Sequence, residues 1–343
     1  MSKAANDAAG AGRELRYLEV YLAPLASVLQ REDVTDIFIN RPGEVWVESL
    51  GGRIERITVP ELGHAALERL VRQIANLSHQ GINREHPLLS ATLPDGARVQ
   101  VVIPPATRGE IAIAIRKHVV ADLTLDDYAR GGALRDMRVG GLVGREPAPE
   151  SIAADADVLT LLRAAVRERR NILVSGGTST GKTTFLNALI KEIPGHERLI
   201  FIEDTPELQY RHQNAVGLVA VKRALGEARV TAEDLLQAAL RMRPDRIIVG
   251  EIRGTEAYAF LRAVNTGHPG SLTTIHADSP QGAIEQLALI ILQSGVQLRR
   301  EDVVAYVSNV VDVFVQLKRG PGGRYISHLV AKSLPGLSGK GAR

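Results

Sequence analysis

The chain contains no cysteine, few aromatic side chains and no apolar run long enough to cross a bilayer. The absence of cysteine excludes disulfides, thiol chemistry and zinc sites with cysteine ligands, and it fits a cytosolic protein. A membrane-spanning helix needs about 20 apolar residues in succession, and the N-terminus lacks the apolar core of a signal peptide. Any contact with a membrane is therefore expected to be peripheral.

Aromatic residues make up only 4% of the chain, and 42 basic side chains are nearly balanced by 39 acidic ones. A channel for nucleic acid combines basic and aromatic side chains. This composition therefore argues against sequence-specific binding of nucleic acid, although a nucleic-acid translocase stays an alternative. Apolar residues account for 45% of the 343 residues, which is typical of a globular protein long enough for two domains.

The first part of the chain, residues 1–120, is predicted to be an α+β domain. Leucines between residues 13 and 29 recur at helical spacing, with Pro24 interrupting the helix. This apolar stripe indicates either a helix packed on its own domain or a helix that docks on a membrane or partner. Strand-like runs separated by turn residues predict a small, mostly antiparallel sheet (35–40, 45–48, 54–59, 98–103 and 111–116), with a helix over 61–77.

Residues 121–151 differ in composition from the sequence before them, with two Gly-Gly pairs, two prolines and little periodicity. We expect a long interdomain linker here. Residues 152–343 alternate between helical patterns and runs rich in Val and Ile, which predicts an α/β domain whose parallel sheet is covered on both faces. The expected strands are 171–175, 199–202, 246–249, 271–275 and 313–317, and residues 1–12 and 336–343 are expected to be tails.

A phosphate-binding loop is the clearest motif in the chain. A short apolar run ends at Ser175, a GxxxxGK[ST] sequence follows, and helical spacing begins after it. Backbone N–H groups at such a helix start bind phosphate, Lys182 neutralises the β- and γ-phosphates, and the Thr183 hydroxyl ligates Mg²⁺. The nucleotide-binding residues are therefore predicted to be Gly176, Gly177, Thr178, Ser179, Thr180, Gly181, Lys182, Thr183 and Thr184.

Ionisable side chains follow three other predicted strands, and the carboxyl ends of parallel strands share one edge of a sheet. Glu203 follows the first strand, Glu251 and then Arg253 follow the second, and His276 follows the third. Either Glu203 or Glu251 is expected to orient or deprotonate the attacking water, and the sequence leaves open which one does. Glu251 would also hold Mg²⁺, directly or through water, His276 would contact the γ-phosphate, and Arg253 is expected to bind the nucleotide.

Four ordered motifs carry a resemblance to a known family: GGTSTGKTT, FIEDTPEL, RMRPDRIIVGEIRG and TGHPGSLTTIHA. On these motifs the chain resembles the secretion traffic ATPases. The N-terminal INRPGEVWVE is similar to the ATPase of type IV secretion systems, the eleventh Vir component. The lack of cysteine departs from the four-cysteine element common in type II enzymes. A tight-adherence or type II-like pilus assembly ATPase stays the near alternative.

The resemblance implies a RecA-like ATPase domain that hydrolyses ATP with Mg²⁺ and assembles with itself into a homohexameric ring. It further implies a location at the cytoplasmic face of the inner membrane, beside other secretion components, and a role in substrate transfer or in the assembly of the apparatus or pilus. Two arginines outside the RecA-like domain, Arg98 and Arg116, are expected to reach the phosphates. Whether ATPase domains are exchanged between protomers is left open.

Overall fold

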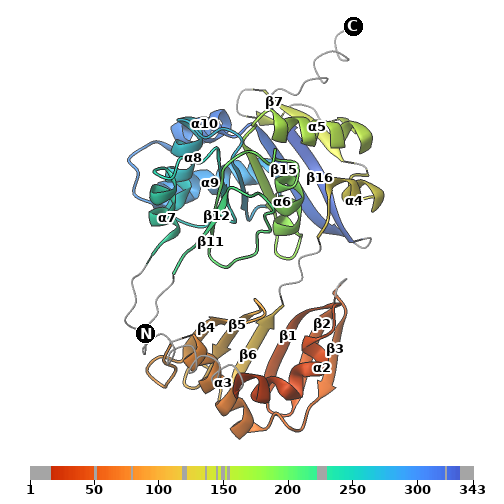
Figure 1. The fold of residues 1–343 in the computed structure, drawn as a ribbon, viewed down its shortest axis with the longest axis vertical. Coiled ribbons are helices and arrows are strands. Elements are labelled where there is room, and N and C mark those ends of the chain that lie inside the picture. The colour runs from red at the N-terminus through yellow and green to blue at the C-terminus, as the bar shows by residue number, and fades with distance from the viewer. Residues whose placement is uncertain are drawn as a thin grey trace. The chain divides into compact units, whose positions relative to one another are not determined.

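The structure is a computed structural model, and it describes residues 17–49, 52–78, 80–117, 122–135, 137–143, 146–147, 151–152, 155–221, 230–320 and 323–332. The chain divides into two compact units, with the change from the first to the second at Val119–Val120 (Figure 1). The expected tails at 1–12 and 336–343 lie outside the described residues.

The first unit contains an antiparallel sheet with the strand order β3-β2-β1-β6-β5-β4. One face of the inner strands is buried, as in β6, where Ile113 and Ile115 are buried and the alanines are less so, whereas the edge strand β3 has no buried residue. The expected antiparallel sheet is confirmed. Its strands are β1 (Val34–Arg41), β2 (Glu44–Ser49), β3 (Ile54–Thr58), β4 (Leu88–Thr92), β5 (Arg98–Val102) and β6 (Ala112–Arg116).

The helices of the first unit pack onto this sheet and complete its core. Residues 17–22 are helical, and η1 (Ala23–Leu25), a 3-10 helix that carries Pro24, separates them from α2 (Ala26–Leu29). Leu18 and Leu25 from the apolar stripe are buried in the core, together with Leu67 and Ile74 of α3 (His64–Leu77). The interruption at Pro24 and the packing of the stripe on its own domain are therefore confirmed.

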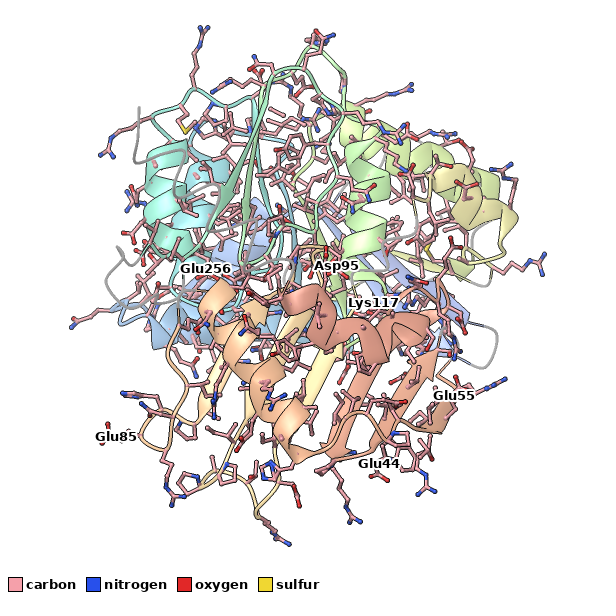
Figure 2. All side chains as sticks on the ribbon, turned by 60° about the horizontal axis from the view of Figure 1, so that its bottom comes forward. Glu44, Glu55, Glu85, Asp95, Lys117 and Glu256 are labelled. Carbon is pink, nitrogen blue, oxygen red and sulfur yellow. The ribbon has the colours of Figure 1, made fainter. Side chains whose placement is uncertain are left out.

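Ion pairs join the loop before β1 to Glu55 of β3, a residue labelled in Figure 2. Arg31 pairs with Asp33 and with Glu55, and its guanidinium lowers the pKa of the Asp33 carboxyl to about 2. The ammonium of Lys117, just after β6, donates to the Arg31 carbonyl, and its partial burial lowers its pKa. Because these side chains stay in contact with solvent, the pairs orient side chains more than they stabilise the fold.

The expected linker at 121–151 is not without regular structure. It contains α4 (Leu125–Arg130), which begins with a capping box between Thr124 and Asp127. It also contains β7 (Arg138–Val143), which pairs with the C-terminal strand β16 (Gly323–Ala331) of the second sheet. Leu125 and Met137 are fully buried in the core of the second unit. The segment therefore belongs to the second unit, because its apolar side chains are buried in the core of that unit. Its glycines weaken the periodicity of the sequence, which is why a linker was expected.

The second unit is built on a sheet with the order β12-β11-β13-β14-β10-β15-β16-β7-β8, with β9 also pairing with β7. The run from β12 to β15 is parallel, and β16 is antiparallel to β15. β12 and β16 are not among the strands predicted from the sequence. The strands are β8 (Glu146–Pro147), β9 (Ser151–Ile152), β10 (Ile172–Gly176), β11 (Leu199–Glu203), β12 (Ala215–Val219), β13 (Arg246–Val249), β14 (Leu272–Ile275), β15 (Val313–Gly320) and β16 (Gly323–Ala331).

Helices cover both faces of this sheet, as expected (Figure 1). α4, α5 (Asp155–Arg167) and α6 (Lys182–Ile190) pack on one face, and α7 (Ala232–Ala239), α8 (Glu256–Asn265), α9 (Pro280–Gln293) and α10 (Arg300–Val310) pack on the other. Successive side chains of β10 alternate between the two cores, with Ile172 and Val174 in one and Leu173 in the other. Within the described ranges, no helix has the length and apolar character needed to cross a membrane.

Candidate nucleotide-binding site

The phosphate loop connects the buried strand β10 to helix α6, as the sequence predicts. Ser179 and Gly181 both have positive φ, at 59° and 89°, so the loop turns sharply before α6 begins at Lys182. The Thr180 hydroxyl donates to the Gly177 carbonyl over 2.9 Å and closes the turn from inside. The N–H groups of the first turn of α6 have no partners within the helix, so this end of it can bind an anion.

Lys182 lies at the centre of the site and is mostly buried. Its ammonium donates to the carbonyls of Gly176 and Gly177, over 3.0 Å and 3.2 Å. It also lies 3.6 Å from the carboxylate of Glu251 and 3.3 Å from Nδ1 of His276. Burial lowers the pKa of Lys182, and the Glu251 charge acts in the opposite direction. The lysine of the loop is thus in contact with two of the groups predicted at other strand ends.

Glu251 contacts the other ionisable side chains of the site, Lys182, His276 and Arg253. It follows β13, and its Oε1 atom lies 3.0 Å from His276 Nε2, while its other carboxylate oxygen pairs with Arg253. β13, β14 and β10 are adjacent parallel strands, so the groups that follow them meet at one edge of the sheet. The predicted convergence of Lys182, Glu251 and His276 is therefore present in the structure.

His276 has a perturbed titration. Partial burial lowers the pKa of its imidazole, and the positive charges of Lys182 and Arg253 lower it further, whereas the carboxylate of Glu251 raises it. Since the ordinary pKa of histidine is about 6.5, a lowered pKa favours the neutral ring at pH 7. A neutral ring carries one N–H donor and one acceptor nitrogen, which suits hydrogen bonding to a phosphate or to a water beside it.

Glu207 belongs to the site but is not among the residues predicted from the sequence. Its Oε2 atom accepts a hydrogen bond over 3.1 Å from the hydroxyl of Thr183, the predicted Mg²⁺ ligand. Asn187 of α6 holds the same loop by donating to the Glu207 carbonyl and accepting from the Gln209 N–H. The signal that could have revealed Glu207 is the second glutamate in FIEDTPEL, four residues after Glu203.

Glu203 is buried at the end of β11, and one of its oxygens is used by the backbone. Oε1 accepts hydrogen bonds from the N–H groups of Glu207 and Leu208, each over 2.7 Å. The Glu203 side chain also packs against Gly250, immediately before Glu251. This geometry gives Glu203 a role in shaping the loop that presents Glu207, while Asp204 is exposed.

Arg98 and Arg116 lie next to each other in the first unit. They are directly opposed on β5 and β6, and Arg116 Nε pairs with Asp36 of β1 over 2.9 Å. Arg98 also takes part in an interaction, so neither side chain is a solitary surface charge. Their predicted contact with phosphates stays a prediction.

The residues present suit a magnesium ion held mainly by a nucleotide. Among the residues that the structure describes, no three His, Asp or Glu side chains are grouped so as to hold a metal ion. Mg²⁺ is commonly bound by one or two protein groups together with substrate phosphates and waters. Thr183, with its hydroxyl oriented by Glu207, and Glu251 near Lys182 are such groups.

Comparison with known proteins agrees with the fold and the motifs. Residues 150–316 match the family model described as "Type II/IV secretion system protein". The type IV secretion system protein VirB11 of Bartonella quintana is 38% identical over 317 residues, covering 88% of this chain and 89% of that protein. VirB11 of Brucella suis is 40% identical over 320 residues, covering 90% and 88%.

A crystal structure of the pilus retraction motor PilT with bound ADP is 22% identical and superposes with a TM-score of 0.57, over 92% of this chain and 83% of that one. That similarity supports the fold, an N-terminal α+β domain followed by a RecA-like domain. The identities to the two VirB11 proteins extend over both units and most of each protein's length. The chain therefore belongs to the VirB11 family of type IV secretion system traffic ATPases.

Proposed function

We propose that this protein hydrolyses MgATP at the phosphate loop and uses the energy to drive type IV secretion. The observation that carries the proposal is the cluster of Lys182, Glu251 and His276, which unites a phosphate-binding lysine, a carboxylate and a neutral imidazole at adjacent strand ends. Binding alone needs only the loop. A carboxylate and an imidazole beside the lysine add the means to position and deprotonate water.

Each side chain then has a definite task. Lys182 neutralises the phosphates, and Glu251 holds and polarises the attacking water. His276 donates or accepts a hydrogen bond at the terminal phosphate, and Arg253 fixes the other oxygen of Glu251. Of the two candidate bases, Glu251 is favoured because its Oε1 atom lies beside Lys182 and His276 at the phosphate loop, whereas Oε1 of Glu203 accepts two backbone N–H groups. Mg²⁺, held by Thr183 and the nucleotide, would neutralise phosphate charge.

Two substitutions test this assignment. Lys182→Ala should lose nucleotide binding and turnover, while Glu251→Gln should bind ATP and lose at least a hundredfold of its hydrolysis rate, about the contribution of a general base. Glu301→Gln, an exposed carboxylate at the start of α10, serves as the control and should behave as wild type. If Glu251→Gln hydrolyses ATP at the wild-type rate, Glu251 is not the base.

We further infer that the protein acts as a homohexamer beside secretion components at the cytoplasmic face of the inner membrane. The identity to VirB11 proteins over both units supports this inference. Sedimentation with and without nucleotide measures the assembly, and affinity capture from membranes measures the partners. A protein that stays monomeric with MgATP, or ATPase activity that DNA stimulates with a steep salt dependence, would contradict the inference.

A further inference from the structure

We propose that Arg324 binds the α- and β-phosphates of the nucleotide, from the side of the phosphate loop opposite to Glu251 and His276. The inference rests on the proposed function of the loop and adds a residue that none of the sequence motifs contains. Arg324 lies near the start of β16, a strand that was not predicted from the sequence, within the same compact unit as the loop.

The side chain of Arg324 lies directly against the phosphate loop. A Cβ atom built on Gly181 would be 3.1 Å from Cδ of Arg324 and 3.7 Å from its Nη1 atom. Gly181 is the residue that immediately precedes Lys182, at the N-terminus of α6. The guanidinium is therefore within one side-chain length of the N–H groups to which the polyphosphate binds.

The charge of Arg324 has no structural use in the described part of the chain. Arg324 makes no ion pair there, and the group on which its charge acts is the buried hydroxyl of Tyr128, whose raised pKa it partly offsets. On the neighbouring strand, Arg319 is directly opposite Arg324. The charge of Arg324 therefore stays available to an anion bound at the phosphate loop.

The strand order indicates which phosphates Arg324 meets. In the sheet, β14 and β13 lie on one side of β10 and carry His276 and Glu251, while β15 and β16 lie on the other. The proposed hydrolysis places the γ-phosphate beside Glu251 and His276. A cation that approaches from β16 therefore meets the opposite end of the polyphosphate, which ADP and ATP share.

This position predicts a contribution to binding and not to the chemical step. Since the α- and β-phosphates change little during hydrolysis, Arg324→Ala should raise KM and leave kcat nearly unchanged. The affinities for ATP and ADP should fall by the same factor, about 10- to 100-fold, which corresponds to losing hydrogen bonds to a charged group. Arg324→Lys should recover part of the loss, because it restores the charge without the planar donors.

The test is titration of the full chain with fluorescent ATP and ADP and, by calorimetry, with inorganic pyrophosphate. Lys318→Ala is the matched control, because Lys318 is an exposed cation on the same hairpin, opposite Tyr325 and one position from Arg319. Wild-type affinities in Arg324→Ala, or an equal loss in Lys318→Ala, would overturn the inference. So would a loss confined to ATP, since that places Arg324 on the γ-phosphate.

The same measurements keep the inference apart from the proposed function. If the wild-type protein binds neither ATP nor ADP, the function of the loop is refuted whatever Arg324 does. If the wild type binds both and Arg324→Ala is unchanged, only the role of Arg324 is refuted. Thermal melts of each variant without nucleotide show whether a loss of affinity comes from a loss of folding, which would also count against a direct contact.

Discussion

The hydroxyl of Thr183 donates a hydrogen bond to the carboxylate of Glu207 over 3.1 Å. Thr183 is the predicted Mg²⁺ ligand in the phosphate loop, and Glu207 lies in the loop after β11, so the bond joins two neighbouring elements of the RecA-like unit. A hydroxyl that donates its proton to a carboxylate keeps its lone pairs available for a metal ion. Groups that orient a metal ligand in this way commonly contribute 10- to 100-fold to metal affinity.

Glu207→Ala should therefore raise the Mg²⁺ concentration needed for half-maximal ATP binding by about tenfold or more. Nucleotide binding without Mg²⁺ should change little, because the loop and Lys182 remain. Titration of fluorescent ATP at a series of Mg²⁺ concentrations measures both effects. Glu207→Gln retains an acceptor oxygen, so the Mg²⁺ concentration that it needs should lie between those of the wild type and Glu207→Ala. Equal Mg²⁺ dependence in all three proteins would refute the role of Glu207.

The titration of His276 should follow the charges around it. Burial and the nearby cations lower its pKa, so the wild-type ring should gain a proton below pH 6.5. Glu251→Gln removes the negative charge that favours the imidazolium and should lower the pKa further. Lys182→Ala removes a positive charge and should raise it.

Imidazole titration by NMR measures these shifts, with His276→Asn used to assign the signal among the nine histidines. A wild-type His276 that titrates above 6.5, or shifts of the opposite sign in the two variants, would contradict the arrangement of charges.

Gly270 should not tolerate a side chain. Its φ is 82°, and a Cβ atom there would lie 2.8 Å from the Cα atom of Arg169, which is backbone and cannot move aside cheaply. Gly270→Ala should lower the free energy of unfolding by about 1–3 kcal/mol beyond the strain of the positive φ itself. Gly295→Ala is the control, since Gly295 has a φ of 85° with no atom within 4 Å of the added Cβ. Denaturant unfolding that gives equal losses would refute the clash.

The fully buried Arg246 forms an ion pair with Glu197, and the stability of the fold should depend on keeping both charges together. Its Nε and Nη2 atoms donate to the two oxygens of Glu197 over 2.7 Å and 2.8 Å. Arg246→Met should destabilise the protein by about 3–5 kcal/mol, because it leaves a buried carboxylate with only the half-exposed Arg169 beside it. Arg246→Met combined with Glu197→Leu should recover part of the loss. Arg299→Met, from an exposed pair with Asp302, should change stability by less than about 1 kcal/mol, and an equal loss there would contradict the argument.

Arg98 and Arg116 are expected to act on the transition state. Arg116→Ala should then lower kcat by a factor on the order of 10³ or more, as for arginines placed on a transferring phosphate, with a smaller effect on ATP affinity. Asp36→Asn frees Arg116 from its ion pair without removing the guanidinium and should have a much smaller effect on kcat. Steady-state kinetics that show equal, small effects in both variants would leave Arg116 a structural residue of the first sheet.

Local patterns were sufficient wherever one stretch of sequence defines its own structure. The bounds of β13 and the phosphate loop follow from side chains close together in the chain. β12 is the last strand at one end of the parallel run and β16 is the antiparallel strand that follows its other end, and both are buried less continuously than β10. Gly217 interrupts the apolar run of β12, AVGLV, and polar residues interrupt that of β16, GRYISHLVA, which makes both strands harder to identify than β10.

The sequence by itself determined that the chain binds a nucleoside triphosphate and carries ionisable groups at neighbouring strand ends, because strand ends and loop motifs are local. Only the tertiary structure decided which oxygens of these groups are already in use. It showed that Glu203 accepts hydrogen bonds from the backbone N–H groups of Glu207 and Leu208, that the Glu207 carboxylate accepts one from Thr183 and that the Arg324 side chain lies against Gly181. These contacts join residues of different elements, and distances of that kind are set by how the sheet orders its strands.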